Sequence, residues 1–195
     1  NTLNWVAKRA VDIVGALFGI IISSPIMLVA ALAVRFTSRG PVIFKQERVG
    51  LHNKPFKMYK FRTMAMQKPS DEQKGWTVKD DPRVTKVGKF LRRTSIDELP
   101  QLFNILIGEM SLVGPRPERP QFVEQFKEEI PRYMIKHQVR PGLTGWAQVN
   151  GYRGDTSIRR RIEYDLFYIE NWTMSFDIKI MFLTIFKGFI NKNAY

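Results

Sequence analysis

The chain of 195 residues has no cysteine and only two histidines, His52 and His137. Without thiols it can form neither disulfide bonds nor thiolate metal sites, which suits a protein that faces the cytosol. Two histidines are too few for a histidine-rich zinc site. Any bound metal is therefore expected to be a hard cation with oxygen ligands, such as Mg²⁺.

Acidic residues are also scarce, since 18 Asp and Glu stand against 31 Lys and Arg and leave a net charge of +13. This excess predicts an anionic partner, which would be lipid headgroups, a phosphate-bearing substrate or a nucleic acid. A membrane segment in the same chain favours lipid and phosphate over nucleic acid.

The longest uncharged run covers 22 residues, from Ile13 to Val34. A straight helix of that length, at about 1.5 Å per residue, would span ~33 Å and could cross a bilayer. The pair Ser24-Pro25 lies just past the midpoint, and proline removes a backbone donor and clashes with the preceding turn, so a bent helix is expected.

Basic residues flank this run on both sides. They are Lys8, Arg9, Arg35, Arg39, Lys45 and Arg48. The positive-inside rule would place both ends on the cytoplasmic side of a membrane. A re-entrant helix satisfies that rule at both ends and a single kinked anchor at one, and the residues alone leave both interpretations open.

The remaining chain predicts an α+β fold that is mainly helical. Strands are expected at 42–44 and 56–61, a loop at 66–82, and helices at 86–93, from about 95, at 121–136 with a break at Pro131, at 155–171 with Asp155 as cap, and at 175–190. The two strands would form a small hairpin. The last helix is almost entirely apolar and fits either a core position or an amphipathic helix at the membrane interface.

The segment from Arg92 to Pro100 holds the densest group of reactive side chains. Ser95 with Glu98 three residues later forms a capping-box pattern, and Asp97 suits the first turn of a helix, so local pattern alone favours a structural interpretation. The functional interpretation uses the same geometry. A helix N-terminus with two adjacent arginines can bind phosphate, two carboxylates can share Mg²⁺, and an aspartate can carry a phosphoryl group covalently.

Further basic residues stand out elsewhere. Arg116 lies between Pro115 and Pro117, which would present a pre-ordered guanidinium or form only a turn. Lys57 and Lys60 lie on the second strand among aromatic residues, a pattern that nucleic-acid binders also show. The alternative function is therefore a membrane-tethered, non-enzymatic binder of nucleic acid or acidic polymer.

Seven motifs then occur in one order along the whole chain. They are Lys8-Arg9-x-x-Asp12, Ser24-Pro25, Tyr59-Lys60-Phe61-Arg62-Thr63-Met64, Asp81-x-Arg83-x-Thr85-x-x-Gly88, Ser95-Ile96-Asp97-Glu98-Leu99-Pro100-Gln101, Val113-Gly114-Pro115-Arg116-Pro117 and the segment from Arg140 to Gly151. In this order they resemble the bacterial sugar transferase family, the monotopic polyprenyl-phosphate phosphoglycosyl transferases.

The resemblance implies an enzyme of the bacterial inner membrane, at its cytoplasmic face. Such an enzyme moves a sugar-1-phosphate from a UDP-sugar to undecaprenyl phosphate and releases UMP, at the start of surface polysaccharide or glycoconjugate synthesis. It also implies Mg²⁺ and a two-step route through a covalent aspartyl intermediate. The expected partners are the UDP-sugar, undecaprenyl phosphate and membrane lipid, with no nucleic acid, and a homodimer is compatible with the sequence.

The resemblance also implies roles for particular residues. Asp97 would be the nucleophile and Glu98 would help to hold Mg²⁺, with Asp97 as the second metal ligand. The expected phosphate or nucleotide contacts are Lys60, Arg92, Arg116 and Arg153, although Tyr152 stands where small members place that last arginine directly. Asp165 and Asp177 match family carboxylates whose role, structural or catalytic, the sequence leaves open.

The run at Ser24-Pro25 resembles the family's re-entrant membrane helix, with Lys8, Arg9 and Asp12 at its point of entry. We therefore expect a re-entrant membrane helix at residues 1–36 and a membrane-associated catalytic domain at 37–195. The tail 192–195 and the loop 151–154 resemble the branch that acts on UDP-glucose or UDP-galactose. Members of that branch often carry extra N-terminal transmembrane helices, and a start at Asn rather than Met fits a catalytic domain taken from such a longer protein.

Overall fold

The computed structural model describes residues 2–66, 81–154 and 156–188. Helices dominate, and they are α1 (Thr2–Thr37), α3 (Lys86–Arg93), α4 (Gln101–Ile107), α5 (Pro120–Glu129), α6 (Trp146–Val149), α7 (Ile158–Glu170) and α8 (Met174–Gly188). The strands are β1 (Ile43–Val49), β2 (Pro55–Phe61), β3 (Ser111–Val113) and β4 (Gly142–Thr144), and short 3₁₀ turns are η1 (Leu51–Asn53), η2 (Ile96–Glu98) and η3 (Tyr133–Gln138). The prediction of a mainly helical fold with a small hairpin is confirmed.

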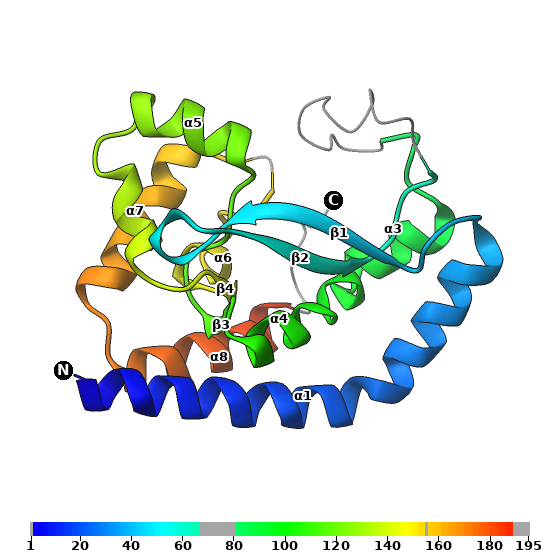
Figure 1. The fold of residues 1–195 in the computed structure, drawn as a ribbon, viewed down its shortest axis with the longest axis horizontal. Helices are drawn as coiled ribbons and strands as arrows, with labels where there is room; N and C mark the ends of the chain where they lie inside the picture. Colours follow the sequence, from blue (N-terminus) through cyan, green and yellow to red (C-terminus); the bar gives the residue numbers. More distant parts are fainter. Residues whose placement is uncertain (1, 67–80, 155, 189–195) are drawn as a thin grey trace.

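Figure 1 shows α1 along the lower edge of the molecule, with a bend in its second half, and the β1–β2 hairpin across the middle. Pro25 lies inside this helix and cannot donate the hydrogen bond that the carbonyl oxygen of Ile21 would otherwise accept. The hydroxyl of Ser24 donates to that same oxygen at 2.8 Å. The Ser-Pro pair therefore both bends the helix and satisfies the carbonyl group that the proline leaves free.

Both halves of α1 belong to the core of the molecule. Ala16, in the first half, is fully buried in a cluster with Leu102 and Ile105 of α4. Val34, in the second half, is buried with Phe61 of β2 and with a leucine of α3. Because its first half packs on α4 and its second half on β2 and α3, both ends of α1 stay close to the rest of the molecule.

Charged side chains fasten the first half of α1. Lys8 donates to Asp177 of α8 at 2.5 Å and to the carbonyl oxygen of Val113 at 3.1 Å. Asp12 accepts from the hydroxyl of Ser111 and from the backbone of the next residue, both at 2.9 Å. Arg9 donates to the last carbonyl groups of α4. Lys8, Arg9 and Asp12, which we predicted at the point where the helix enters the membrane, therefore contact other segments of the chain. Their position at a membrane interface stays a prediction.

The hairpin places one basic side chain in the interior. β1 and β2 pair antiparallel, with Phe44 opposite Lys60. Side chains alternate between the two faces of a strand, so Lys60 shares a face with Phe56 and Met58, which are buried against α4. The Nζ atom of Lys60 points to the interior for that reason, whereas Lys57 is exposed.

The second sheet fixes the loop that carries Arg116. β3 and β4 pair in parallel, and Gly114 and Gly142 continue the ladder into the loop at Pro115. A Cβ atom on Gly142 would lie 2.0 Å from the backbone nitrogen of Gly114, so only glycine permits this close approach. Arg116 thus follows a segment in which two backbone strands are held rigidly together.

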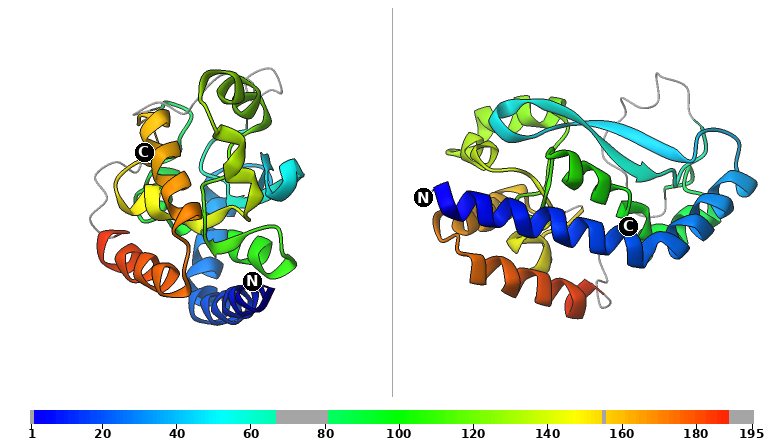
Figure 2. Two further views of the ribbon diagram at one scale, coloured as in Figure 1. Left: turned by 90° about the vertical axis from the view of Figure 1, so that its left-hand side faces the viewer. Right: turned by 60° about the horizontal axis from the view of Figure 1, so that its bottom comes forward.

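Large apolar side chains remain exposed mainly on α1 and α8 and at one edge of α4. Examples are Phe18, Ile21, Ile22 and Leu28 on α1, Phe103 and Ile107 on α4, and Ile178, Phe182, Ile185 and Phe186 on α8. Figure 2 shows α1 nearly end-on with α8 beside it, so both helices lie on one side of the molecule. An apolar surface of this extent marks a membrane or protein contact.

By length and composition α1 could cross a membrane over Leu3–Thr37. Re-entry on the same side, the interfacial position of α8 and the division at residue 36 stay predictions. Several boundaries differ from expectation. The helix expected from Ser95 begins only at Gln101, and the helix expected to be capped by Asp155 is capped by Ser157, whose side chain accepts from the backbone of Arg160.

The helix at 86–93 and the break at Pro131, where α5 gives way to η3, are confirmed. Residue 155, most of the loop predicted at 66–82 and the tail 192–195 lie outside the described residues.

Candidate active site

The turn that carries the two acidic residues is not a capped helix start. Ile96–Glu98 forms a single 3₁₀ turn, and the preceding Ser95 has a left-handed backbone with φ 57° and no capping bond from its side chain. The predicted capping box is therefore wrong. A non-glycine residue in this conformation costs on the order of 1–3 kcal/mol, and such residues occur mostly at functional sites.

Glu98 is the centre of a cluster of cations drawn from three other parts of the chain. Its Oε1 lies 3.0 Å from Nζ of Lys60 and 2.9 Å from Nη2 of Arg116, and its Oε2 lies 2.7 Å from Nη2 of Arg153. Burial raises the pKa of Glu98, but the three cations outweigh it and hold the pKa well below its usual value. Glu98 is therefore a fixed negative charge that holds the three cations in place.

Asp97 has the opposite environment. The residue is 6% exposed, and its Oδ1 has no hydrogen-bond partner among the residues that the structure describes. Burial raises the pKa of Asp97, with Lys60 opposing this and Glu98 adding to it. A buried carboxylate oxygen without a partner is costly, so it points to a ligand or to chemistry at this position.

Neighbouring carboxylates with pKa values pushed in opposite directions are typical of sites in which the two groups have different tasks. Glu98 uses both of its oxygens on fixed cations, whereas Asp97 keeps one oxygen available. The arrangement can attract a phosphate group to the cations and present it to Asp97.

Arg92 of α3 stands beside this pair. Its Nε donates to the hydroxyl of Thr63 at 2.8 Å. Burial lowers the pKa of Arg92, and its interaction with Asp97 is the main effect that opposes this. The hydrogen bond fixes the guanidinium and leaves it close enough to Asp97 for electrostatic coupling.

The loop of Arg116 is held from behind by residues that the motifs did not indicate. Lys136 donates to the carbonyl oxygen of Arg116 at 3.0 Å, and Arg48 donates to that of Pro117 at 3.0 Å. Glu118, which is 1% exposed, binds Arg161 at 2.8 Å. Nothing in the local sequence distinguishes Lys136 from a surface lysine, although Glu118 follows the arginine loop directly.

The structure thus brings together six of the predicted site residues, which are Lys60, Arg92, Asp97, Glu98, Arg116 and Arg153. Arg153 reaches Glu98 despite the tyrosine before it, and it also donates to Ser95 at 3.2 Å.

Asp165 and Asp177 lie apart from this site. Asp177 binds Lys8 and the hydroxyl of Tyr168, so it docks α1 on the body. Asp165 pairs with Lys136 at 3.5 Å.

No group of three or more metal-ligating side chains occurs in the described parts of the chain. Asp97 and Glu98 nevertheless fit Mg²⁺, because this ion is commonly held by one or two carboxylates together with substrate phosphate oxygens. The free Oδ1 of Asp97 is the available protein ligand, whereas Glu98 would have to share oxygens that three cations already contact.

Comparison with known proteins indicates the family of the chain. The family model described as "Bacterial sugar transferase" matches residues 3–191. The chain belongs to this family. A "UDP-glucose:undecaprenyl-phosphate glucose-1-phosphate transferase" of Klebsiella pneumoniae is 53% identical over 100% of this chain and 43% of the relative.

Two other relatives show the range of the family. A "UDP-N-acetylgalactosamine-undecaprenyl-phosphate N-acetylgalactosaminephosphotransferase" of Aeromonas hydrophila is 50% identical over 91% of this chain and 42% of the relative. The "Exopolysaccharide production protein PSS" of Rhizobium leguminosarum bv. phaseoli is 42% identical over 94% of this chain and 95% of the relative. The chain spans less than half the length of the first two relatives.

Proposed function

We propose that this chain is the catalytic part of a membrane enzyme. It transfers a sugar-1-phosphate from a UDP-sugar to undecaprenyl phosphate at the cytoplasmic face of the bacterial inner membrane. The names of the relatives support this reaction. The observation that carries it is Asp97, a buried carboxylate with one unpartnered oxygen beside a fixed cluster of cations.

In the first step an oxygen of Asp97 attacks the phosphorus that bears the sugar. The bond between that phosphorus and the bridging oxygen of the diphosphate breaks, and UMP leaves with the electron pair. The sugar phosphate is then bound to the Asp97 carboxylate as an acyl phosphate. The step is balanced with Asp97 in its carboxylate form, because a carboxylate oxygen makes the new bond, UMP leaves as an anion and no proton is transferred.

In the second step a phosphate oxygen of undecaprenyl phosphate attacks the same phosphorus. The bond to Asp97 breaks, the carboxylate is restored, and the product is a polyprenyl diphosphate sugar. Lys60, Arg92, Arg116 and Arg153 would bind and orient the phosphates in both steps. Mg²⁺ held by Asp97, Glu98 and the substrate would neutralise charge on the diphosphate.

The fold supports a site at the membrane surface. Lys8 and Asp12 near one end of α1 and Val34 near the other all contact the same body, which carries the site. We propose that α1 enters and leaves the membrane on one side, with its exposed apolar face in lipid. A soluble UDP-sugar and a lipid-anchored phosphate could then meet at Asp97.

The chemical proposal is tested with Asp97→Asn. We expect UMP release to fall by at least about 10³-fold, the scale seen when a covalent nucleophile is removed. The unaltered enzyme incubated with UDP-sugar alone should gain the mass of one sugar phosphate. The exposed carboxylate variant Glu163→Gln should keep both properties. Transfer without any adduct would instead indicate direct attack by the lipid phosphate.

The orientation of α1 is tested with single cysteines in this cysteine-free chain. Asn4 precedes the apolar run 13–34 of α1, and Phe44 follows it in β1. We expect cysteines at both positions to react from the cytoplasmic side of membrane vesicles. Labelling from opposite sides would show a spanning helix. A panel of UDP-sugars would then identify the donor, for which we favour UDP-glucose or UDP-galactose.

A further inference from the structure

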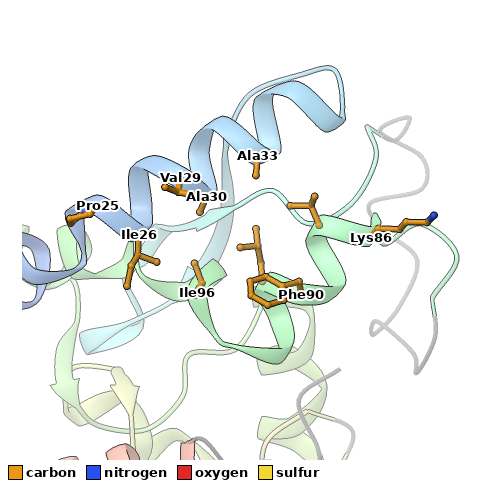
Figure 3. A pocket seen from close by; sticks show the side chains of 10 residues that line it. Pro25, Ile26, Val29, Ala30, Ala33, Lys86, Phe90 and Ile96 are labelled. Carbon is orange, nitrogen blue, oxygen red and sulfur yellow. The ribbon is translucent and has the colours of Figure 1, made fainter.

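An apolar groove of about 600 Å³ runs between the second half of α1 and α3. Figure 3 shows Ile26, Val29 and Ala30 of α1 on one side and Phe90 of α3 and Ile96 of η2 on the other. Lys86 is the one charged residue among those that line it, and its ammonium group points outward in Figure 3. The volume is within the range of sites that hold small ligands, about 300–1,000 Å³.

Two features of α1 create this space. Pro25 lies at one end of the groove, and Ala30 and Ala33 face α3 with small side chains (Figure 3). Larger residues at these two positions would fill the gap between the helices. The groove has no polar partner to offer water, so it favours a hydrocarbon occupant.

The groove borders the site at one of its lining residues. Ile96 lines the groove and is followed directly by Asp97 and Glu98 in the same 3₁₀ turn. That turn presents an apolar side chain to the groove and two carboxylates to the cations. A molecule with an apolar chain in the groove would therefore bring its head to Asp97, where Arg92 and Lys60 favour an anion.

We propose that the groove binds the isoprene units nearest the phosphate of the polyprenyl phosphate acceptor, and this rests on the proposed function. The occupant joins an apolar chain to an anionic phosphate, which matches an apolar groove whose lining residue Ile96 directly precedes Asp97 and Glu98. The groove would then align the phosphate of the acceptor for the second step.

The first test fills the groove with Ala33→Phe. Leu28→Phe is the matched control, because Leu28 lies on the same helix, is 62% exposed and does not line the groove. The measured quantity is the rate of transfer to subsaturating undecaprenyl phosphate divided by the rate of adduct formation from UDP-sugar alone. We expect Ala33→Phe to lower this ratio about tenfold and Leu28→Phe to keep it.

This ratio separates the two proposals. If the unaltered enzyme neither forms an adduct nor transfers sugar phosphate, the proposed function fails. If it does both and Ala33→Phe transfers as well as Leu28→Phe, the groove proposal alone is overturned.

A second test uses the unaltered enzyme with a polyprenyl phosphate that carries a photoreactive diazirine on the isoprene unit next to the phosphate. Cross-links are expected at residues of the groove, such as Ile26 and Phe90, and excess undecaprenyl phosphate should suppress them. A phosphatidylethanolamine with the diazirine in an acyl chain serves as the comparison. Cross-links from that lipid at the same residues, unaffected by undecaprenyl phosphate, would assign the groove to bulk lipid and contradict the proposal.

Discussion

At the scale of single residues, Asp97 and Glu98 show how adjacent carboxylates acquire different properties. Glu98 faces three cations and has a depressed pKa, whereas burial raises the pKa of Asp97 and one of its oxygens has no partner among the described residues. One residue thus organises the cations and the other is free to react.

Thr63 is a positioning residue at this scale, because its hydroxyl accepts the Nε hydrogen of Arg92. Thr63→Val keeps the shape of the side chain and removes the acceptor, and a lost bond to a charged group costs roughly 1.5–3 kcal/mol. If Arg92 binds a substrate phosphate, we expect KM for the UDP-sugar to rise about tenfold with little change in kcat.

The control for Thr63→Val is Thr63→Ser, which retains the hydroxyl and should restore KM. Thermal unfolding of both variants reports on the fold separately. A fall in kcat with unchanged KM would show that Arg92 acts elsewhere than in substrate binding.

At the scale of elements, α1 combines a proline with a substitute for the hydrogen bond that the proline removes. Pro25 removes one donor, and Ser24 supplies another to the carbonyl oxygen of Ile21. In a hydrocarbon environment no water could replace that bond, so the neighbouring serine allows a proline inside a membrane helix. The sequence indicated the bend, and the structure shows that Ser24 satisfies the carbonyl group that Pro25 leaves without a donor.

This pairing predicts a coupling between Ser24 and Pro25. Ser24→Ala should lower the free energy of unfolding in detergent by about 1 kcal/mol, because it leaves the Ile21 carbonyl group without a donor. In a Pro25→Ala background the same change should cost almost nothing, because the new backbone N–H bonds Ile21.

A double-mutant cycle in chemical unfolding measures this coupling. Ser23→Ala is the control, since Ser23 bonds Gly19, whose carbonyl group the regular helix already satisfies. Equal costs of Ser24→Ala in both backgrounds would contradict the pairing.

At the scale of the whole molecule, a second set of buried charges supports the site from behind. Asp165, Lys136 and Glu118 are each no more than 2% exposed, and Lys136 holds the backbone of Arg116. Burial raises the pKa of Asp165 to about 6 and lowers that of His137 to about 4. The interior therefore contains two groups whose titration acts on stability in opposite directions.

The signs follow from proton linkage. The raised pKa of Asp165 means that its favourable contribution is present below pH 3.8 and is lost as the pH rises through about 6. The lowered pKa of His137 means that stability is lost as the pH falls from 6.5 through about 4. In the unaltered protein these two effects partly offset each other over the same range.

Single variants should separate them. Relative to the unaltered protein, Asp165→Asn should gain about 3 kcal/mol of unfolding free energy between pH 4 and pH 7, at about 1.4 kcal/mol per pKa unit. His137→Asn should also gain about 3 kcal/mol of unfolding free energy relative to the unaltered protein, but as the pH falls from 7 to 4. Urea unfolding at each pH measures both differences, and differences that do not change with pH would contradict the assignment.

The sequence by itself determined the elements whose signals are local. The apolar run with its proline gives α1, alternation gives the β1–β2 hairpin, and a proline ends α5. The ordered motifs also indicated the family and the residues Asp97, Glu98, Lys60 and Arg116. Each of these signals depends on neighbours along the chain, which the sequence shows directly.

Only the tertiary structure decided how those residues act. Local pattern favoured a capping box at Ser95, but three cations from distant segments draw Glu98 away, and one of them, Arg153, lies 58 residues from Ser95. The docking of Lys8 on Asp177, the support of Arg116 by Lys136 and the groove beside Ile96 likewise join segments that are far apart in the chain. Electrostatic attraction and burial act through space, so they can override a local preference that the sequence states clearly.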